Sequence, residues 1–579
     1  MRSHQESRTE RARHELARKR RVVHVAAGRE PADLVLKNTS YVNVFSHQIC
    51  SGDIAVAEGL IAGVGCSYRG KEEMDLTGKL LLPGFLDAHI HLESSMVTPG
   101  EFARAVLPHG TTTVIADPHE IANVMGAEGI AYMLQATEGL PVDVQLMLPS
   151  CVPATPMDES GAALDCRSLD HFYGHPRVRG LGEVMDYVGT VAANSQVLEK
   201  IAAAQVRHRR VDGHAPGLAG YDLNAYVAAG VCSDHECYSL EDALEKLALG
   251  QHIMIREGTA AKNLEALLPL LTPQYADRCM FCCDDKHPSD LLAQGHIDFL
   301  VKTAIRAGVD PILAVQAACL NPARYFQLND RGAIAPGYLA DLVVIDNFQD
   351  FTIEKVFKLG RLVYGGGRLR DFTSPQVDPG LARRARDTFH VAPLTARDLQ
   401  DARPRGVIGL VPGEIVTEDK GRAGGVDLSR DILKIAVMER HKSTGHVGIG
   451  YLQGYGLKEG AVATSVSHDA HNIIVVGTDE QSMAAAANRV AEDRGGIVVW
   501  RAGGCTAEVV LAIAGIMSED PLECVNQALE GAKEAAFRQG VHRGIDPFMT
   551  LSFLALPVIP ALRITTRGVF DVNTQRFIF

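Results

Sequence analysis

The stretch from Gly84 to His91, which reads GFLDAHIH, combines an apolar run with two histidines two positions apart. In an extended strand, side chains at i and i+2 point to the same face, so one strand could present both His89 and His91 to a single metal ion. A histidine pair at this spacing is also common in proteins without metal. The pair therefore indicates a metal site only if further ligands reach it from other parts of the chain.

Seven further apolar runs follow this stretch, and the eight runs end 21 to 35 residues apart. A strand, a helix and their connections need about that much chain. Amphipathic helical patterns lie between the runs, such as the stripe of apolar residues from Ile297 to Ile305. The predicted fold is therefore α/β, with a (β/α)8 TIM barrel over residues 84–325. The predicted strand ends are His91, Asp117, residue 149, Val184, His214, His235, Arg256 and Asp284.

Active sites of such barrels lie at the carboxyl ends of the strands. Those ends carry histidines and carboxylates, which are the ligand types that Zn, Fe and Mn accept. Because these residues come from six different strands and meet at one rim, their convergence predicts a metal centre far more strongly than the histidine pair alone. The residues in question are His89, His91, Asp117, His119, Glu120, Glu183, His214, His235 and Asp284.

Composition excludes several classes of protein. Hydrophobic residues make up 46% of the 579 residues and charged residues 22%, which is ordinary for a folded globular chain. The net charge of -13 argues against a nucleic-acid partner. The longest apolar stretch is broken by Pro557 and Pro560, so no membrane span is expected. Twelve scattered cysteines indicate a reduced, cytoplasmic protein, and the Cys279/Cys282 pair reads as part of a buried strand.

The remaining chain divides into segments that differ in composition and in the pattern of apolar residues. Residues 1–30 are basic and predict a solvated tail. Short strands over 31–83 and again over 326–375 predict one β domain made from both ends of the chain that flanks the barrel. Residues 376–400 resemble a linker, and 401–579 alternate strands with helices, which predicts an additional C-terminal α/β domain. Within it, the glycine-rich stretch GHVGIGYLQGYG is expected to be a loop.

Three polar residues of the C-terminal segment allow two interpretations. His468 and His471 would share a face only on a helix, whereas the apolar NIIVVG directly after them predicts a strand. With Asp469, they are either structural or part of the wall of the active site.

Longer motifs resemble a known superfamily. PGFLDAHIHLE, the strand-end His214, His235 and Asp284, and the segment NPARYFQLNDRGAIAPGYLADLVVID resemble the amidohydrolase superfamily over residues 50–370. This resemblance implies a distorted barrel with a composite β-sandwich domain. More narrowly, ADPHEIANV, GLGEVM, DGHAPGL and SDHE, together with the tail that contains SHDAHNI, resemble the adenine deaminases over nearly the whole chain after the basic tail.

The resemblance implies a centre of two divalent metal ions, with Mn or Fe favoured and Zn possible. His89 and His91 would bind one ion, and His214 and His235 the other. Many relatives bridge their metals with a carboxylated lysine, but here Glu183 occupies that place and would bridge directly. Asp284 would lie beside the metal and carry protons, whereas strand alternation turns the adjacent Asp285 away.

The implied reaction is the hydrolytic deamination of free adenine to hypoxanthine and ammonia, by attack of metal-activated hydroxide at C6, in purine salvage. The expected substrate contacts are Asp117, His119, Glu120 and Arg256; alternatively, the first three hold a ligand histidine or shape their own loop. The chain is expected to act as a homodimer or a higher homo-oligomer.

Three rival functions were weighed against this one. A zinc deaminase of the HxE…PCxxC type is excluded, because no PCxxC occurs in the sequence. An amidohydrolase that cleaves an amide, such as an N-acetyl sugar-phosphate deacetylase, would need basic groups for the phosphate and gives the C-terminal segment no role. A non-catalytic relative would have lost its ligands, and all six expected ligands are present.

Overall fold

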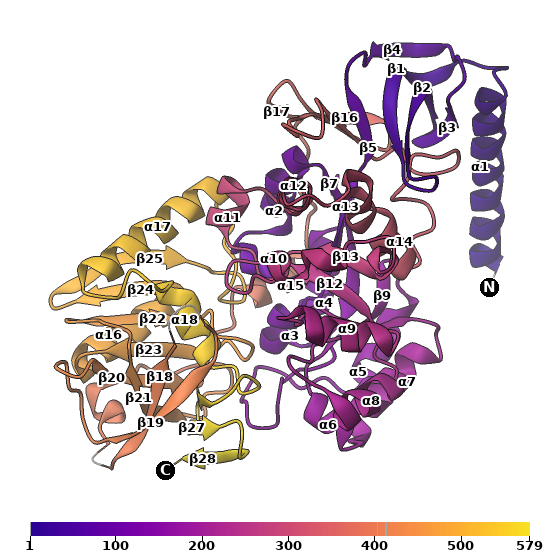
Figure 1. Ribbon diagram of the computed structural model, residues 1–579. Coiled ribbons are helices and arrows are strands. Elements are labelled where there is room, and N and C mark those ends of the chain that lie inside the picture. Colours follow the sequence, from indigo (N-terminus) through magenta and orange to yellow (C-terminus); the bar gives the residue numbers. More distant parts are fainter. Residues whose placement is uncertain (1, 402, 412–413, 579) are drawn as a thin grey trace.

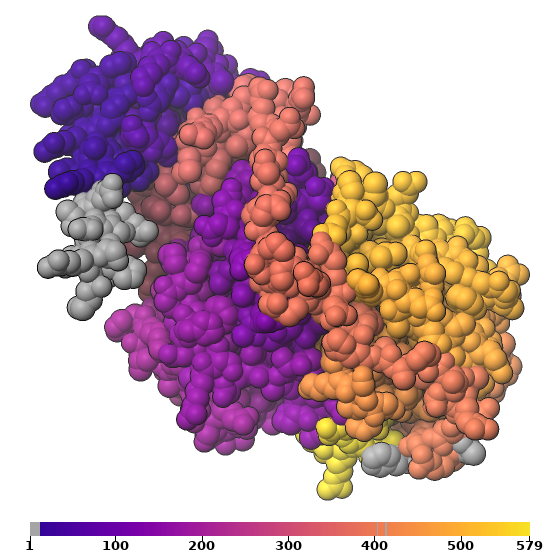
Figure 2. Space-filling model, turned by 180° about the vertical axis from the view of Figure 1, so that it is seen from behind, coloured from indigo at the N-terminus to yellow at the C-terminus, as the bar shows by residue number. Residues whose placement is uncertain are grey.

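The computed structural model describes residues 2–401, 403–411 and 414–578 (Figure 1). The chain forms a sheet unit at the top of the view, a central unit of alternating strands and helices, and a C-terminal unit coloured orange to yellow. The last two lie side by side in both Figure 1 and Figure 2. Among the helices described, none is long and apolar enough to cross a membrane.

The sheet unit takes its strands from two distant parts of the chain. Its nine strands form one sheet in the order β17-β16-β15-β14-β5-β1-β2-β3, with β4 beside β1. The two parts join where β14 pairs antiparallel with β5, with Leu342 opposite Pro83. The strands are β1 (Ala32–Asn43), β2 (Gln48–Ala57), β3 (Leu60–Val64), β4 (Gly70–Asp75), β5 (Leu80–Pro83), β14 (Leu342–Ile345), β15 (Ile353–Lys358), β16 (Arg361–Gly365) and β17 (Arg368–Leu369).

The basic N-terminal segment is not the solvated tail that its composition predicts. Residues Arg2–Ala26 form helix α1, which lies against the sheet unit in Figure 1. Val25 is fully buried and packs with Ala32 and Ala55, and Arg21 pairs with Glu30 at 3.1 Å. A few apolar residues at the end of the helix therefore anchor a segment in which charged residues dominate the composition.

The central unit contains all eight predicted strands, and every neighbouring pair is parallel. They form a five-stranded sheet in the order β10-β9-β8-β7-β6 and a three-stranded sheet in the order β11-β12-β13. The strands are β6 (Phe85–Ile90), β7 (Thr111–Ala116), β8 (Asp143–Leu148), β9 (Val178–Val184), β10 (Arg210–Gly213), β11 (Ser233–Asp234), β12 (His252–Arg256) and β13 (Cys279–Cys282).

Backbone bonds connect these two sheets at both edges. Just past β13, the Asp284 amide donates to the His89 carbonyl at 2.9 Å, and on the other side the Cys232 amide donates to the Val211 carbonyl at 2.8 Å. The Asp87 carboxylate accepts from the amides of His89 and Cys283 and ties β6 to the end of β13. The parallel strands thus form one curled surface whose carboxyl ends face the same side.

Helices follow the strands where the apolar patterns predict them. Ser239 caps α9 by accepting from the Asp242 amide at 3.2 Å, and α12 buries Ile297, Leu300 and Val301. Helix α3 begins shortly after β7. The longer helices are α2 (Pro99–Val106), α3 (His119–Met125), α4 (Ala127–Ala136), α7 (Ser195–Gln205), α8 (Gly220–Ala228), α9 (Leu240–Ala248), α12 (Ile297–Arg306) and α13 (Pro311–Ala318).

The C-terminal unit is α/β, as predicted, and its main sheet has the order β19-β18-β21-β20-β23-β22-β24-β25. Helices α16 (Glu480–Glu492), α17 (Leu522–Arg538) and α18 (Pro547–Leu554) accompany it. The strands are β18 (Arg405–Leu410), β19 (Thr417–Ala423), β20 (Ile432–Met438), β21 (Val447–Gln453), β22 (Ala461–Thr464), β23 (Ile473–Gly477), β24 (Gly496–Arg501) and β25 (Gly504–Val510), with a separate ribbon of β26 (Leu562–Thr565), β27 (Gly568–Asp571) and β28 (Arg576–Ile578).

Two predictions for this half of the chain are wrong. The glycine-rich stretch expected to be a loop forms strand β21, because a Cβ at Gly448 would lie 1.9 Å from the Thr565 carbonyl and only glycine lets the ribbon pack so closely. The expected linker contains helix α15 (Pro379–Ala385), whose Leu381 is buried in the main core. In Figure 2 this salmon-coloured segment runs along the surface between the units.

Candidate active site

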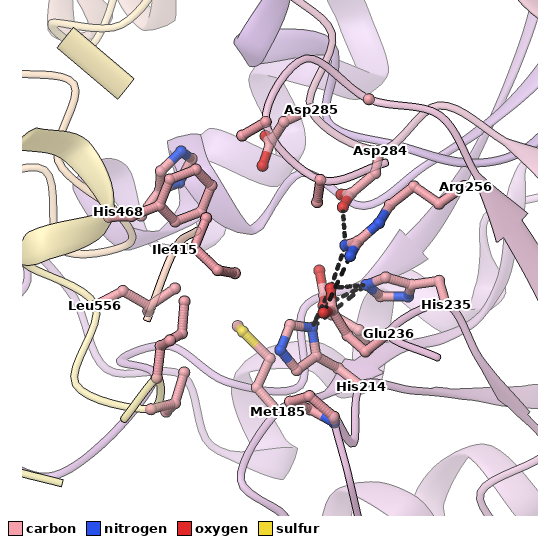
Figure 3. A pocket seen from close by; sticks show the side chains of 18 of the residues that line it. Met185, His214, His235, Glu236, Arg256, Asp284, Asp285, Ile415, His468 and Leu556 are labelled. Carbon is pink, nitrogen blue, oxygen red and sulfur yellow. Dashed lines mark hydrogen bonds and ion pairs between the residues drawn. The ribbon is translucent and has the colours of Figure 1, made fainter. Parts of the chain in front are cut away.

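A cavity of about 820 Å³ opens where the carboxyl ends of the central strands face the C-terminal unit. Figure 3 shows its two sides: His214, His235, Glu236 and Arg256 lie on one, and Ile415, His468 and Leu556 lie on the other. The cavity therefore takes its wall from both units.

Glu183, at the end of β9, lies at the centre of the ionisable residues, and its side chain is 3% exposed. Its Oε1 lies 3.2 Å from His91 Nε2 and 3.5 Å from His89 Nε2. Its Oε2 lies 2.6 Å from His214 Nδ1 and 3.3 Å from His235 Nε2. Each oxygen of one carboxylate thus faces a different pair of histidines.

Asp284 meets the first of these pairs. Its Oδ1 lies 3.0 Å from His91 Nε2 and 3.5 Å from His89 Nε2, and its Oδ2 accepts from Arg256 at 2.6 Å. Asp285 also lines the cavity, contrary to the prediction that alternation turns it away. The reason is local: β13 ends at Cys282, and Asp284 has a φ of 59°, so strand alternation no longer applies there.

Backbone and buried side chains orient these ligands from behind. His91 Nδ1 lies 2.9 Å from the Asp117 carbonyl, an acceptor, so Nδ1 donates and Nε2 is left to face the carboxylates. Asp117 Oδ2 accepts from the Glu183 amide at 3.1 Å. The Asp117 side chain is fully buried and is not among the cavity-lining residues.

The electrostatics favour charged forms throughout this cluster. Burial would raise the pKa of the Glu183 carboxyl, but His235, His214 and His89 hold it well below its usual value. Burial would likewise raise the pKa of Asp284, and the Arg256 guanidinium with the same histidines holds it low. For His89, burial opposes protonation, yet Asp284 and Glu183 raise its pKa to about 10. Glu183 and Asp284 are therefore ionised at neutral pH.

The donor set fits a pair of cations. His89 Nε2 is buried, has no hydrogen-bond partner among the described residues, and faces the carboxylates of Glu183 and Asp284, each at 3.5 Å. Several trios have ligand atoms within 4.8 Å of one another: His89, His91 and Asp284 form one, and His89, Glu183 and His235 form another. Imidazole and carboxylate without thiolate are ligands of Mn, Fe and Zn. The predicted ligands His89, His91, Glu183, His214, His235 and Asp284 thus come together.

Arg256 is bound to acidic side chains and does not point freely at a substrate. It forms an ion pair with Glu236 as well as with Asp284, and all three are buried. Glu236, the last residue of the SDHE motif, is a functional residue that was not predicted from the sequence. A strand-end carboxylate directly after the ligand His235 was the available signal.

His119 and Glu120, both predicted, line the cavity from α3 and lead from the metal ligands to the C-terminal unit. His119 Nδ1 lies 3.5 Å from Glu183 Oε1. Glu120 Oε1 lies 2.5 Å from His468 Nδ1, and its Oε2 pairs with His471. His468 and Asp469 line the cavity, so the active-site interpretation of this motif agrees with the structure.

The cluster of Glu120, His468 and His471 has the spacing of a metal site but not the hydrogen-bonding of one. His471 Nδ1 accepts from the Ser467 amide at 3.2 Å, so its proton lies on Nε2, the atom that faces Glu120. A nitrogen that carries a proton cannot bind a metal. We therefore interpret the cluster as a buried connection between the central and C-terminal units.

Apart from Glu414, the rest of the far wall is apolar, and it was not predicted from the sequence. It comes from two segments of the C-terminal unit, residues 415–416 and 553–560, which sequence analysis could not place near the barrel. The apolar residues are Ile415, Val416, Phe553, Leu556, Val558 and Ile559.

Comparison with known proteins gives matches for both the central and the C-terminal unit. Residues 80–363 match the amidohydrolase family, and 413–576 match the adenine deaminase C-terminal domain. The adenine deaminase of Desulfatibacillum aliphaticivorans is 48% identical over 564 residues, 96% of this chain and 98% of that one. Adenine deaminase 2 of Carboxydothermus hydrogenoformans is 46% identical over 560 residues, with the same coverage. Among solved structures, β-aspartyl dipeptidase of Fervidobacterium islandicum AW-1 is 16% identical with a TM-score of 0.45, covering 60% of this chain and 99% of that one.

Proposed function

This chain belongs to the adenine deaminase family, and from that premise we propose that it hydrolyses free adenine to hypoxanthine and ammonia in purine salvage. The observation that carries the proposal is the position of Glu183, whose two carboxylate oxygens each face a different histidine pair beside Asp284. The reaction breaks the bond between C6 and the amino nitrogen, which is the C–N hydrolysis of an amidohydrolase.

The finer architecture belongs to the same proposal. The two parallel sheets of the central unit act as one distorted (β/α)8 barrel over residues 84–325, supported by the bonds that connect β6 with β13 and β10 with the segment before β11. Residues 31–83 and 326–375 form a composite β-sandwich domain. Residues 401–579 form the adenine-deaminase-type C-terminal domain.

Two divalent metal ions, Mn or Fe in preference to Zn, fit the donor set. His89 and His91 would hold one ion and His214 and His235 the other, with Glu183 shared between them and Asp284 beside the first. Such ions supply, when bound, a water whose pKa is lowered from about 15.7 to about 7. The chain supplies the ligands, their orientation and the routes for protons.

Asp284 is the residue placed to move protons. Its carboxylate is ionised, lines the cavity and lies next to the ligand histidines, so it can accept a proton from the attacking water and return it to N1 or to the departing amino group of adenine. Arg256 donates to Asp284 Oδ2 and thereby fixes the carboxylate with Oδ1 toward the histidines. His119 and Glu120 complete the rim on which the purine would lie.

Cellular context follows from composition more than from the site. None of the twelve cysteines forms a disulfide, which suits a reducing cytoplasm. A homodimer or a higher homo-oligomer is the assembly we expect.

The alternative, a sugar-phosphate deacetylase, fits less well. A phosphate group needs cations that are free to bind it. Among the described cavity-lining residues, the arginine and lysine side chains are Arg256 and Lys262, and Arg256 is taken up by Glu236 and Asp284.

Ultraviolet conversion of adenine by protein reconstituted with Mn tests the proposal directly. We expect stoichiometric ammonia and hypoxanthine, and we expect Asp284→Asn to lower kcat by about 10²- to 10⁴-fold, the usual contribution of a general acid–base group. The control is Asp277→Asn, an exposed aspartate at the opposite end of β13, which should keep wild-type kcat. Turnover of adenosine without turnover of adenine would refute the free-base assignment, and a fully active Asp284→Asn would refute the role of Asp284.

A further inference from the structure

We infer that Asp469, from the C-terminal unit, accepts a hydrogen bond from the imidazole N–H of free adenine and so distinguishes the free base from its nucleosides. The inference rests on the proposed function and adds a specificity-determining residue on the wall opposite the metal ligands.

The first support is the rigid placement of Asp469. The histidine before it and the histidine two positions after it, His468 and His471, are both held by the same carboxylate, Glu120 of the central unit. His468 also stacks on Phe553, with ring centroids 4.9 Å apart and planes at 23°. Asp469 itself is 2% exposed and lines the cavity. Its carboxylate is therefore fixed in place before any ligand arrives.

The second support is an unused acceptor. Asp469 Oδ2 is buried and has no hydrogen-bond partner in the described part of the chain. The imidazoles around the carboxylate lie beyond hydrogen-bond distance: His119 Nε2 is 3.9 Å from Oδ2, and His468 Nδ1 is 3.8 Å from Oδ1. A buried carboxylate oxygen without a donor is costly, and a ligand N–H that reaches it would remove that cost.

The third support is distance from the reacting centre. The imidazole of His119 spans the gap between the two carboxylates: its Nδ1 lies 3.5 Å from Glu183 Oε1, and its Nε2 lies 3.9 Å from Asp469 Oδ2. A purine whose C6 faces the Glu183 side can lie along this imidazole. Its five-membered ring then extends toward Asp469, and the exocyclic amine stays at the metal ligands.

The chemistry of the ligand completes the argument. Free adenine carries one N–H on its five-membered ring, at N9 or in the tautomer at N7, whereas in a nucleoside the sugar replaces the hydrogen at N9. A carboxylate in a largely apolar wall would lose its only donor if a nucleoside bound, and sites that leave a buried polar group unpaired reject such analogues strongly. Burial raises the pKa of Asp469 to about 6, with His119 opposing and Glu120 adding to the rise, so it is mainly ionised at neutral pH.

The test compares two substrates in three proteins. Wild type, Asp469→Ala and Asp469→Asn are each assayed with adenine and with 9-methyladenine, and hypoxanthine and 9-methylhypoxanthine are compared as competitive inhibitors. We expect Asp469→Ala to lower kcat/KM for adenine by about 10- to 100-fold, mainly through KM, since a hydrogen bond to a charged group is lost. For the 9-methyl compounds, kcat/KM and the inhibition constant should change less than about threefold. Asp469→Asn keeps an acceptor oxygen, so its kcat/KM for adenine should fall less than that of Asp469→Ala.

Controls separate this role from a structural one. Glu159→Gln changes a carboxylate at the same junction of units, where it contacts His446 and Thr566 without lining the cavity, and should leave the preference for adenine unchanged. In Asp469→Ala, an equal loss of kcat/KM with both substrates, or a loss of bound metal, would overturn the inference. Adenine turnover by wild type would still uphold the proposed function. If wild type did not deaminate adenine, both would fall.

Discussion

Lys246 is a fully buried lysine that holds two of the ligand-bearing segments. From α9 it donates to the Ala215 carbonyl and to Asp234 Oδ2, each at 2.8 Å, and it pairs with Asp242 at 3.0 Å. Asp234 in turn accepts from the Ala215 amide at 2.9 Å. Since Ala215 follows His214 and Asp234 precedes His235, one ammonium group fixes the backbone beside both histidines.

Replacement of this lysine should be strongly destabilising. Lys246→Met leaves the Asp234 charge buried without its partner, which costs about 3–5 kcal/mol. Differential scanning calorimetry should show an apparent Tm lowered by several degrees, together with weaker binding of one of the two metal ions. The control Lys71→Met removes an ion pair with Asp33 in which the lysine is 63% exposed, and it should cost no more than about 1 kcal/mol. Equal losses in the two variants would contradict the role given to Lys246.

At this scale the sequence predicted which histidines and carboxylates gather in the cavity, but not their surroundings. His89, His91, His214, His235 and Asp284 could be found because each follows a buried apolar run, and parallel strands bring such ends together. Asp285 was misplaced because strand alternation fails once the chain turns. The neighbours that lie across the junction of units, such as the apolar wall, follow no periodicity that a sequence reveals.

Among the elements, β15 is connected to the amino-terminal side of the central strands by one side chain. Lys358 donates to Asp143 on β8 at 2.7 Å, to Asp341 at 2.6 Å and to the Thr112 carbonyl at 3.1 Å. The three acceptors belong to different segments, so this lysine joins the sheet unit to the side opposite the cavity.

Removal of this connection should loosen the sheet unit and spare the chemistry. We expect Lys358→Met to lower stability by about 3–5 kcal/mol at pH 7 and to leave KM for adenine unchanged. Burial would raise the pKa of Asp143, but Lys358 and Arg331 hold it below its ordinary value. A carboxyl with a lowered pKa stabilises the fold above its unfolded pKa of about 3.9 and loses that effect as pH falls further. The difference in the free energy of unfolding between the variant and wild type should therefore persist at pH 5 and shrink below about pH 4. A difference that stays constant with pH would contradict the role given to the Lys358–Asp143 pair.

Helices and strands could be predicted where their buried residues form a regular pattern in the sequence. The eight central strands are covered by helices and read as apolar runs, and the stripe on α12 repeats at helical spacing. Strand β21 was missed because its glycines permit close packing and also resemble a loop. Helix α1 was missed because only a few residues at its end, Val25 among them, contact the sheet unit.

In the whole molecule, the metal ions are expected to contribute to stability as well as to chemistry. Removal of metal leaves four imidazoles and two carboxylates close together, all of them buried except His214, and a ligand at 100 times its Kd adds about 2.7 kcal/mol. A chelator should therefore lower the apparent Tm by several degrees, and Mn should restore it. The variant His89→Asn, already deficient in one ion, should show a smaller decrease in Tm with the chelator. An unchanged Tm in chelator-treated wild type would count against the proposed metal centre.

The central and C-terminal units could not have been placed against each other from the sequence. The Ser518 amide donates to the Met96 carbonyl at 2.8 Å, and the Thr98 amide donates to the Ser518 carbonyl at 3.1 Å. These residues are more than 400 positions apart, and none belongs to a motif. The resemblance to a family indicated that both units are present, and the structure shows how they share one cavity.

The direct use of Glu183 has a consequence for how the enzyme becomes active in a cell. A lysine that serves as a bridge must first react with carbon dioxide, so that assembly of its metal centre depends on dissolved bicarbonate. Glu183 leaves the ribosome with its carboxylate complete, and the fold already aims each oxygen at its own histidine pair. Reconstitution of this protein should therefore proceed at the same rate in degassed buffer as in buffer with bicarbonate, with the supply of metal as the only chemical requirement.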